Sequence, residues 1–240
     1  MPLAPTLPAH GAAIPAIGFG TSGMGDVRAE HIATALKAGY RHIDTARKYG
    51  TERAVGEGMR ASGVPRAEIF LCTKVSHENL HARDFARSVN ESLKALGVDY
   101  VDLLLVHWPE KNTPLPETMA ALAKARRDGL TRHIGVANFN IAMLDAAIGL
   151  CPEPLVTLQA ECHAYLDQAK GDRGLQGARA CAHRLLSARP RPAAGRQGAG
   201  RYRAAPRQDF RPGGAALFDA ARHDRRHSAL VERDAHRREH

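Results

Sequence analysis

The sequence predicts an α/β fold, a (β/α)8 TIM barrel that is present here as about six βα units. Apolar, strand-like runs return at intervals of roughly 30 residues, the length of one βα repeat, and helical patterns fill the gaps. The strand-like runs begin near Ile17, Arg41, Ile69, Val101, Arg132 and Leu155. Because strands and helices alternate, we expect parallel strands that right-handed crossovers close toward a barrel.

The individual elements show their signals in order along the chain. Apolar side chains recur at helical spacing in residues 85–96 and again in residues 115–125, and Gly97 and Gly129 follow as stop signals. Between these helices, the apolar run at residues 101–106 is typical of a strand covered on both faces. The length of 240 residues is close to the roughly 250 usual for such a barrel, so one domain is the simplest interpretation.

A doubly wound parallel sheet is the structural alternative. That fold usually carries a Gly-rich phosphate-binding turn after its first strand, with a helix directly behind the turn. Residues 18–23, Gly-Phe-Gly-Thr-Ser-Gly, do not follow this spacing. The sequence therefore favours the barrel.

Several features are typical of a cytoplasmic protein. The first residues form neither a basic leader nor an apolar stretch, and no apolar run has membrane-spanning length. The four cysteines, Cys72, Cys151, Cys162 and Cys181, lack the close spacing of a redox or zinc motif, and the histidines show no ligand spacing. We therefore expect buried or incidental thiols, no metal and no membrane partner.

Residues 171–240 differ in composition from the rest of the chain. They hold 16 Arg, no Lys and 7 Asp plus Glu; this surplus of 9 equals the net charge of +9, so residues 1–170 are neutral. Only 8 of these 70 residues are Leu, Val, Phe or Ile, below the roughly 20% at which a chain can bury a core. We therefore expect a disordered or non-native tail that supplies no further strands and leaves the first and last strands of a six-strand arc unpaired.

Four polar residues, Asp44, Tyr49, Lys74 and His107, lie just past the ends of apolar runs. The carboxyl ends of parallel barrel strands share one rim, which is where active sites lie. A neighbouring ammonium favours the phenolate form of a tyrosine and eases release of its proton, and a carboxylate keeps that ammonium charged. These residue types predict a carbonyl reductase in which Tyr49 is the acid. Lys74 would ease release of the Tyr49 proton, and Asp44 would keep Lys74 charged. His107 can orient the substrate oxygen.

Segments around these residues occur together in one known family. The segments are Gly-Tyr-Arg-His-Ile-Asp-Thr-Ala at 39–46, Glu-Arg-Ala-Val-Gly at 52–56, Thr-Lys at 73–74, Asp-Tyr-Val-Asp-Leu at 99–103, His-Trp-Pro at 107–109, Gly-Val-Ala-Asn-Phe at 135–139 and Gln-Ala-Glu-Cys-His at 159–163. Their order and spacing through residue 170 resemble the aldo-keto reductases. Ser-Gly-Val-Pro-Arg at 62–66 and Glu-Asn-Leu at 78–80 are most similar to bacterial 2,5-diketo-gluconate reductases.

This resemblance implies a reaction and a set of partners. Hydride would pass from NADPH, bound without a Rossmann turn, to an aldehyde or ketone such as 2,5-diketo-gluconate or a small dicarbonyl. Trp108 would line the substrate pocket beside His107. The folded protein would be a monomer.

The resemblance also assigns residues to the cofactor. Asn138 and Gln159 match the positions that hold the carboxamide of nicotinamide, and Gly20 and Thr21 match the rim beside it. The cofactor-binding positions are therefore Gly20, Thr21, Asp44, Asn138 and Gln159.

The chain departs from the family pattern in two places. Ala137 stands where the family usually has a Ser that shares the carboxamide contact. Beyond Lys170, neither the aromatic residue that stacks on nicotinamide nor the Ile-Pro-Lys/Arg-Ser segment that binds the 2′-phosphate is recognisable. We therefore divide the chain into a reductase barrel portion, 1–170, and an Arg-rich tail, 171–240, and we expect weak or absent turnover.

The composition of the tail suggests a frameshift near Lys170. With suitable codons, residues 222–239 read one nucleotide later can encode Gly-Met-Thr-Val-Val-Ile-Pro-Arg-Ser-Ser-Asn-Ala-Met-Arg-Ile-Ala-Glu-Asn, which resembles the absent phosphate-binding segment. Three alternatives remain open. The chain could be an inactive, truncated reductase or a cofactor-sensing regulatory subunit, or the Arg-rich tail could bind nucleic acid.

Overall fold

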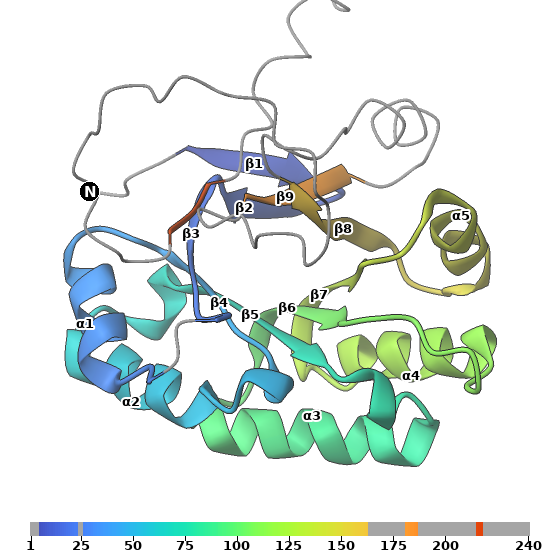
Figure 1. Ribbon diagram of the computed structural model, residues 1–240, viewed down its shortest axis with the longest axis horizontal. Helices are drawn as coiled ribbons and strands as arrows, with labels where there is room; N and C mark the ends of the chain where they lie inside the picture. Colours follow the sequence, from blue (N-terminus) through green and yellow to red (C-terminus); the bar gives the residue numbers. More distant parts are fainter. Residues whose placement is uncertain (1–4, 24–25, 163–180, 187–214, 218–240) are drawn as a thin grey trace, which may run out of the picture.

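The described part of the chain forms a closed barrel of eight strands (Figure 1). The structure, a computed structural model, describes residues 5–23, 26–162, 181–186 and 215–217. The strand order around the barrel is β10-β3-β4-β5-β6-β7-β8-β9. A separate two-stranded sheet, β1-β2, accompanies the barrel.

Six neighbouring strands come from consecutive βα units, and each pairs in parallel with the next. These strands are β3 (Ile17–Gly20), β4 (His42–Asp44), β5 (Phe70–Val75), β6 (Val101–Val106), β7 (Thr131–Ala137) and β8 (Leu155–Cys162). Each begins within one residue of the position that the sequence predicts. The six parallel βα strands are therefore confirmed.

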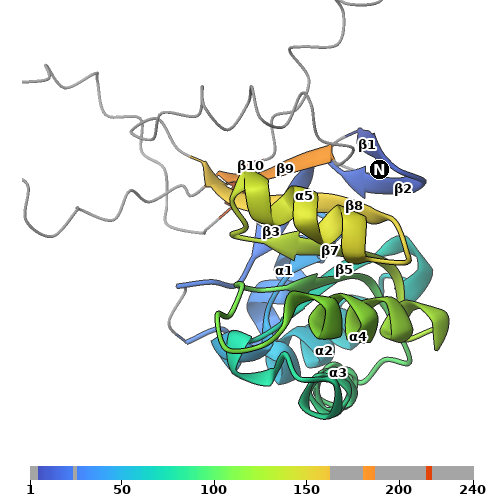
Figure 2. The same cartoon turned by 90° about the vertical axis from the view of Figure 1, so that its right-hand side faces the viewer.

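Five helices follow β3 to β7 in turn and wrap the outside of these strands (Figures 1 and 2). The helices are α1 (Ala29–Lys37), α2 (Glu52–Ser62), α3 (Ala82–Leu96), α4 (Leu115–Arg127) and α5 (Ile141–Leu150), with 3-10 turns η1 (Arg47–Tyr49), η2 (Arg66–Glu68) and η3 (His77–Asn79). The apolar positions of α3 face inward, and Gly97 ends this helix in the left-handed conformation at φ 67°. Across the described residues, no helix has the length and apolar character needed to cross a membrane.

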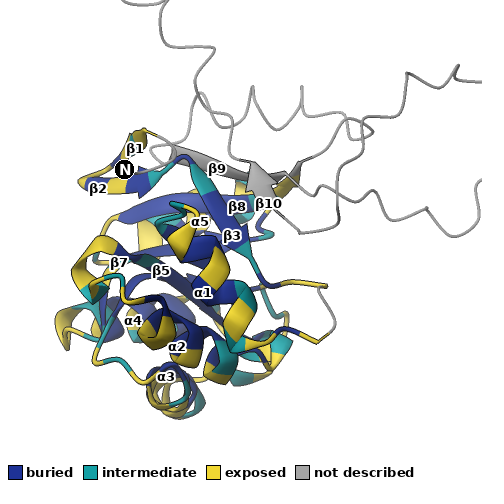
Figure 3. Ribbon diagram, turned by 90° about the vertical axis from the view of Figure 1, so that its left-hand side faces the viewer, coloured by how far each residue is buried: buried dark blue, intermediate teal, exposed yellow. Residues whose placement is uncertain are grey.

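Two glycines let helices α1, α2 and α3 pack closely. A Cβ added at Gly56 would lie 2.0 Å from the Leu96 carbonyl oxygen of α3. One added at Gly58 would lie 2.4 Å from the Ala29 carbonyl oxygen of α1. Because backbone cannot move aside for a side chain, only glycine fits at these crossings. Figure 3 shows the resulting pattern of buried inner faces and exposed outer faces on the helices.

The remaining two barrel strands correct one expectation. Strand β9 (Cys181–Leu186) pairs in parallel with β8, and β10 (Ala215–Leu217) pairs antiparallel with both β3 and β9. The prediction that residues 171–240 supply no strands and leave the edges of the arc unpaired is therefore wrong. Pairing uses backbone N–H and C=O groups that every residue except proline has, so a tail of low apolar content can still contribute short strands. The closing β10 is three residues long and antiparallel, unlike the strand of a βα unit.

A hairpin seals the end of the barrel at which the strands begin. Strands β1 (Thr6–Ala9) and β2 (Ala12–Pro15) are joined by His10 and Gly11, both with positive φ, as a two-residue turn of type I′ requires. The hairpin contributes Ala9, Ala12 and Ile14 to an interior cluster with Cys72, Leu103, Leu105, Ala137 and Val156. The opposite end, where the strands finish, carries the polar residues.

Candidate active site

The four predicted catalytic residues meet at the carboxyl ends of the barrel strands. Asp44 is the last residue of β4, Lys74 lies near the end of β5, and His107 directly follows β6. Tyr49 lies in the turn η1, which leads from β4 into α2. Since neighbouring parallel strands end at the same rim, the fold brings these separate segments together.

Asp44 and Lys74 form a buried ion pair. The Lys74 Nζ donates to Asp44 Oδ1 at 2.6 Å and to the Thr45 carbonyl oxygen at 2.9 Å. Burial alone lowers the pKa of Lys74, but the Asp44 carboxylate outweighs it and the pKa is raised. Burial alone raises the pKa of Asp44, but the charge and hydrogen bonds of its partners outweigh it and the pKa is lowered. Both groups are therefore charged at neutral pH.

Tyr49 and His107 lie side by side over this pair. The Tyr49 hydroxyl oxygen is 3.4 Å from His107 Nε2, and the two rings meet edge to face with centroids 5.4 Å apart. The Lys74 Nζ lies 5.4 Å from the centroid of the Tyr49 ring. A phenol is thus positioned between an imidazole and a buried ammonium.

His107 is neutral at physiological pH. Burial, followed by the positive charge of Lys74, lowers the pKa of His107 from 6.5 to about 4. Its Nδ1 is buried and has no hydrogen-bond partner among the described residues. A proton on Nδ1 would be a buried donor without an acceptor, so the tautomer with the proton on Nε2 is favoured. That proton faces Tyr49.

The two predicted carboxamide-binding residues also lie at this rim. Asn138 follows β7 with φ 63°, a conformation that asparagine tolerates better than most residues. Its Nδ2 donates to the His107 carbonyl oxygen at 2.8 Å, and its backbone N–H donates to the Gln159 carbonyl oxygen at 2.9 Å. These bonds connect the ends of β6, β7 and β8.

Gln159 makes a contact that the sequence analysis missed. Its Nε2 donates to Asp44 Oδ2 at 2.8 Å, so both carboxylate oxygens of Asp44 are hydrogen-bonded. Each of the amides of Gln159 and Asn138 has a second N–H and a carbonyl oxygen. Those groups are chemically suited to pair with the carboxamide of a nicotinamide.

The remaining predicted residues surround the same rim in different ways. Gly20, at the end of β3, pairs in register with Asp44. The Thr21 hydroxyl is buried and bonds to other hydroxyl groups. Trp108 follows His107 and is 50% exposed, which leaves its ring available for contact. Ala137 is buried and has no hydroxyl group to offer a cofactor.

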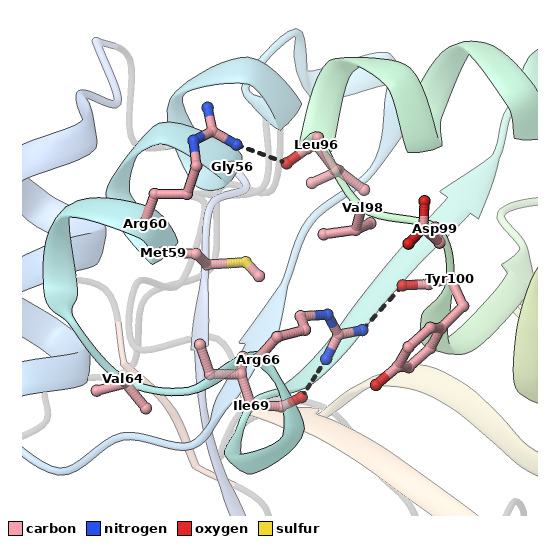
Figure 4. A pocket seen from close by; sticks show the side chains of 11 residues that line it. Gly56, Met59, Arg60, Val64, Arg66, Ile69, Leu96, Val98, Asp99 and Tyr100 are labelled. Carbon is pink, nitrogen blue, oxygen red and sulfur yellow. Dashed lines mark hydrogen bonds between the residues drawn. The ribbon is translucent and has the colours of Figure 1, made fainter.

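Two hollows in the described structure lie at the other end of the strands. One, of about 250 Å³, is bounded by α2, the end of α3 and the residues before β6, where Arg60 and Arg66 donate to backbone carbonyl oxygens (Figure 4). The other, of about 590 Å³, lies beside the β1-β2 hairpin. Neither is lined by Asp44, Tyr49, Lys74 or His107. Within the described ranges, no cluster of three or more His, Cys, Asp or Glu is arranged to hold a metal ion.

Comparisons with known proteins show the family. A model of the aldo/keto reductase family matches residues 16–174, so the chain belongs to that family. It is 45% identical to methylglyoxal reductase DkgB of Escherichia coli O157:H7 over 162 residues, 66% of this chain and 61% of the relative. The chain spans about three fifths of the length of such curated relatives.

Solved structures show the same likeness. One described as a putative 2,5-diketo-D-gluconic acid reductase B has 43% identity and a TM-score of 0.69, covering 72% of this chain and 62% of the other. An aldo-keto reductase of Bombyx mori in complex with NADP has 32% identity and a TM-score of 0.69, covering 75% of this chain and 65% of the other. These likenesses support the predicted relationship to 2,5-diketo-gluconate reductases.

Proposed function

We propose that this protein reduces an aldehyde or ketone to an alcohol with NADPH as hydride donor. The observation that supports this most is the position of Tyr49, whose hydroxyl oxygen is 3.4 Å from His107 Nε2 and whose ring centroid is 5.4 Å from the buried Lys74 Nζ. A carbonyl oxygen bound there would meet two proton-bearing groups at once. General acid catalysis of this kind contributes roughly 10² to 10⁴ in rate.

In the proposed mechanism each residue has one role. The Tyr49 hydroxyl donates its proton to the carbonyl oxygen of the substrate as that oxygen gains negative charge. Lys74 stabilises the phenolate that remains, and Asp44 keeps Lys74 charged and in place. Neutral His107 donates from Nε2 to the same oxygen and orients the carbonyl group. NADPH, when bound, supplies the hydride.

We assign the cofactor to the rim formed by β3, β4, β7 and β8. Asn138 and Gln159 would hold the carboxamide of nicotinamide through the second N–H and the carbonyl oxygen of their amides, with Gly20, Thr21 and Asp44 beside the ring. Ala137 has no hydroxyl group, so we expect weaker binding of the carboxamide than a serine at this position would give. The NADP complex of a related reductase supports the choice of nicotinamide cofactor.

The proposed substrates are small dicarbonyls such as methylglyoxal, or 2,5-diketo-gluconate. The relatives named for these substrates support this choice. Half-exposed Trp108 beside His107 would form one wall of the substrate pocket. We further propose a monomeric cytoplasmic enzyme whose small-molecule substrate is its main partner.

The division of the chain at Lys170 is part of the proposal. The family model ends at residue 174, close to the point at which the composition changes. A frameshift near codon 170 would explain both, and sequencing the gene there decides it: no shifted frame that continues a reductase sequence means that the explanation is wrong. An Arg-rich tail that binds nucleic acid predicts instead salt-sensitive binding that is lost when residues 171–240 are deleted.

The proposed reaction is tested by product analysis. Purified protein is incubated with NADPH and methylglyoxal, and the alcohol product is identified by chromatography while NADPH is followed by absorbance. We expect slow formation of the alcohol, matched one to one by NADPH consumed. Reduction at ordinary enzyme rates would contradict the expected weak or absent turnover, no product at all would favour the alternative of an inactive, truncated reductase, and NADPH consumption without an alcohol product would contradict the proposed reaction.

A further inference from the structure

Three threonine hydroxyls form a closed ring beside the proposed catalytic residues. The Oγ1 atoms of Thr21, Thr45 and Thr51 are each 3.0 Å from the other two. All three residues are buried, at 1%, 0% and 8% exposure. Each hydroxyl has one proton to donate and can also accept, so with Thr21 donating to Thr45 the three bonds can run in one direction around the ring. Such a ring is cooperative, because each bond polarises the next.

Thr51 takes part in this ring in place of a common local role. It is the N-cap residue of α2, a position at which a threonine side chain usually accepts from a backbone N–H of the first helical turn. Here the Thr51 side chain makes no such cap. The hydroxyl therefore serves a tertiary contact where the sequence pattern alone would predict a local one.

The hydroxyl ring links the two ends of the turn that carries Tyr49. Thr45 and Thr51 stand on either side of the turn η1, so their bond draws together the two ends of the segment that presents the phenol. The Thr45 carbonyl oxygen also accepts from Lys74 Nζ at 2.9 Å, and the Thr21 backbone N–H donates to the Asp44 carbonyl oxygen at 3.0 Å. The ring thus connects the backbone segments that contact or carry Tyr49, Lys74 and Asp44.

A second buried contact fixes the same turn from the other side. Thr73 Oγ1 donates to Glu52 Oε1 at 2.7 Å, which connects the start of α2 to the residue before Lys74. Glu52 is 3% exposed, and its Oε2 lies 3.8 Å from Nη1 of Arg47, the first residue of η1. With this contact in place, opening the ring is expected to shift the turn without unfolding it.

We propose that the hydroxyl ring positions Tyr49 against Lys74 and His107, and that Thr51 is the positioning residue that closes it. The proposal rests on the function proposed above. None of the three hydroxyls needs to touch the reacting atoms; they act through the backbone of η1. Loss of the Thr51 hydroxyl should lower kcat and leave KM and NADPH affinity nearly unchanged, because Thr51 is not among the residues assigned to the substrate or the cofactor.

The test compares Thr51→Val, which removes only the hydroxyl, with Thr51→Ser, which keeps it. Thr131→Val is the matched control, because Thr131 is buried and its hydroxyl donates to the His133 carbonyl oxygen at the opposite end of the barrel. Thermal unfolding of every variant shows whether the fold is kept. The structural readout, which needs no turnover, is the NMR resonance of the ¹³C-labelled ζ carbon of Tyr49, assigned with Tyr49→Phe.

We expect Thr51→Val to lower kcat by about 10-fold to 100-fold, the scale of a misplaced catalytic group. It should also shift the Tyr49 resonance, while Thr51→Ser and Thr131→Val resemble the wild type in both. Thr45→Val should shift the resonance in the same way, and the double variant Thr45→Val/Thr51→Val should add little, because a ring that is already open loses little more.

Two results would overturn the positioning role. One is an unchanged Tyr49 resonance in Thr51→Val; the other is additive effects in the double variant. Failure of the proposed function looks different. In that case Tyr49→Phe would leave any carbonyl reduction intact, while Thr51→Val and Thr45→Val would still shift the Tyr49 resonance. The two ideas are therefore tested separately.

Discussion

Two buried carboxylates, one at each end of the barrel, have similar surroundings and different chemistry. Asp44 lies where the strands finish and is 2% exposed; Asp102 lies where they begin and is 4% exposed. Each pairs with a cation, and in each case a cation lies against a tyrosine ring. A carboxylate, a cation and a tyrosine together are therefore insufficient to define a reaction site.

The differences lie in the cation and in the tyrosine hydroxyl. Asp102 is held by Arg66 at 2.8 Å and Arg132 at 3.1 Å, and both guanidinium groups stack on Tyr100 with their carbons 4.4 Å from its ring centroid. The Tyr100 hydroxyl accepts from Arg132 at 2.8 Å. This arrangement suits a structural role, because arginine remains charged and its planar group of N–H donors binds several partners at once.

At the other end, the phenol of Tyr49 faces a neutral imidazole instead of a guanidinium. Lys74, which among the described residues is the cation paired with Asp44, is fully buried and donates to Asp44 and to a backbone carbonyl oxygen. Proton transfer needs a donor that an incoming oxygen can reach and a charge that favours its loss. The comparison thus supports the proposal that the reaction takes place at the Asp44 end, whereas the ion pairs of Asp102 have a structural role.

The largest difference in stability is expected when each carboxylate loses its cation. Lys74→Met leaves the Asp44 charge buried without a counter-ion, which should cost about 3–5 kcal/mol in the free energy of unfolding. Arg66→Met should cost less, because Arg132 still pairs with Asp102. Urea unfolding measures both. Adding Asp44→Asn to Lys74→Met should recover part of the loss, and equal losses in the two single variants would contradict the comparison.

Gln159→Leu tests the second hydrogen bond to Asp44. It removes the Nε2–H that donates at 2.8 Å to a buried carboxylate, so we expect a loss of roughly 1–3 kcal/mol in stability. NADPH affinity, measured by fluorescence quenching, should fall as well, because the same amide is assigned to the cofactor. A variant that keeps wild-type stability would mean that the bond contributes nothing to holding Asp44.

Acid should affect the Asp44 end in two stages. The pKa of His107 is lowered to about 4 in the folded protein, mainly by burial, while an unfolded histidine titrates near 6.5. As the pH falls from 6.5 to 4 the unfolded state takes up a proton that the folded state does not, so stability falls. Asp44, whose pKa is also lowered, loses its stabilising contribution at still lower pH, as its carboxylate becomes protonated.

The pH prediction is tested by NMR titration of His107 and by measuring the free energy of unfolding at each pH. The His107 ring signals should titrate with a midpoint near 4, and His107→Gln should lose less stability than the wild type between pH 6.5 and 4. A His107 midpoint near 6.5 would show that burial and Lys74 do not act on this ring as described.

The smallest effect on stability is expected for the ion pair between Arg132 and Asp102, which lies on the exposed side of the Asp102 cluster. The Arg132 side chain is 52% exposed, so solvent screens its pairing with Asp102. Arg132→Gln should therefore change the free energy of unfolding by at most about 1 kcal/mol and leave carbonyl reduction unchanged. A large loss of reduction in this variant would show that the two ends of the barrel are not independent.

The sequence predicted the strands and the rim residues because both depend on local patterns. Apolar runs identified β3 to β8, and the polar residues just past them identified Asp44, Lys74 and His107. The partners of these residues were harder to predict. Gln159 was assigned to the cofactor without its bond to Asp44, and Thr51 was not noticed. Several polar side chains share the rim, and their rotamers and the strand register decide which of them pair.

The closing strands were missed for a related reason. Strand β10 pairs antiparallel over three residues, and β9 lies in a segment poor in apolar residues. Pairing of this kind depends on backbone groups that carry no sequence signal. Composition described the tail as a whole and could not identify a short segment that pairs with a neighbour.

The most direct test of the central claim compares the two tyrosines. Tyr49→Phe and Tyr100→Phe each remove one hydroxyl from a tyrosine that lies beside a cation. Rates of NADPH consumption with methylglyoxal should fall by at least about 10²-fold in Tyr49→Phe and remain near the wild-type rate in Tyr100→Phe. NADPH binding should be kept in both. Reduction that continues unchanged in Tyr49→Phe would contradict the assignment of the acid and with it the active site.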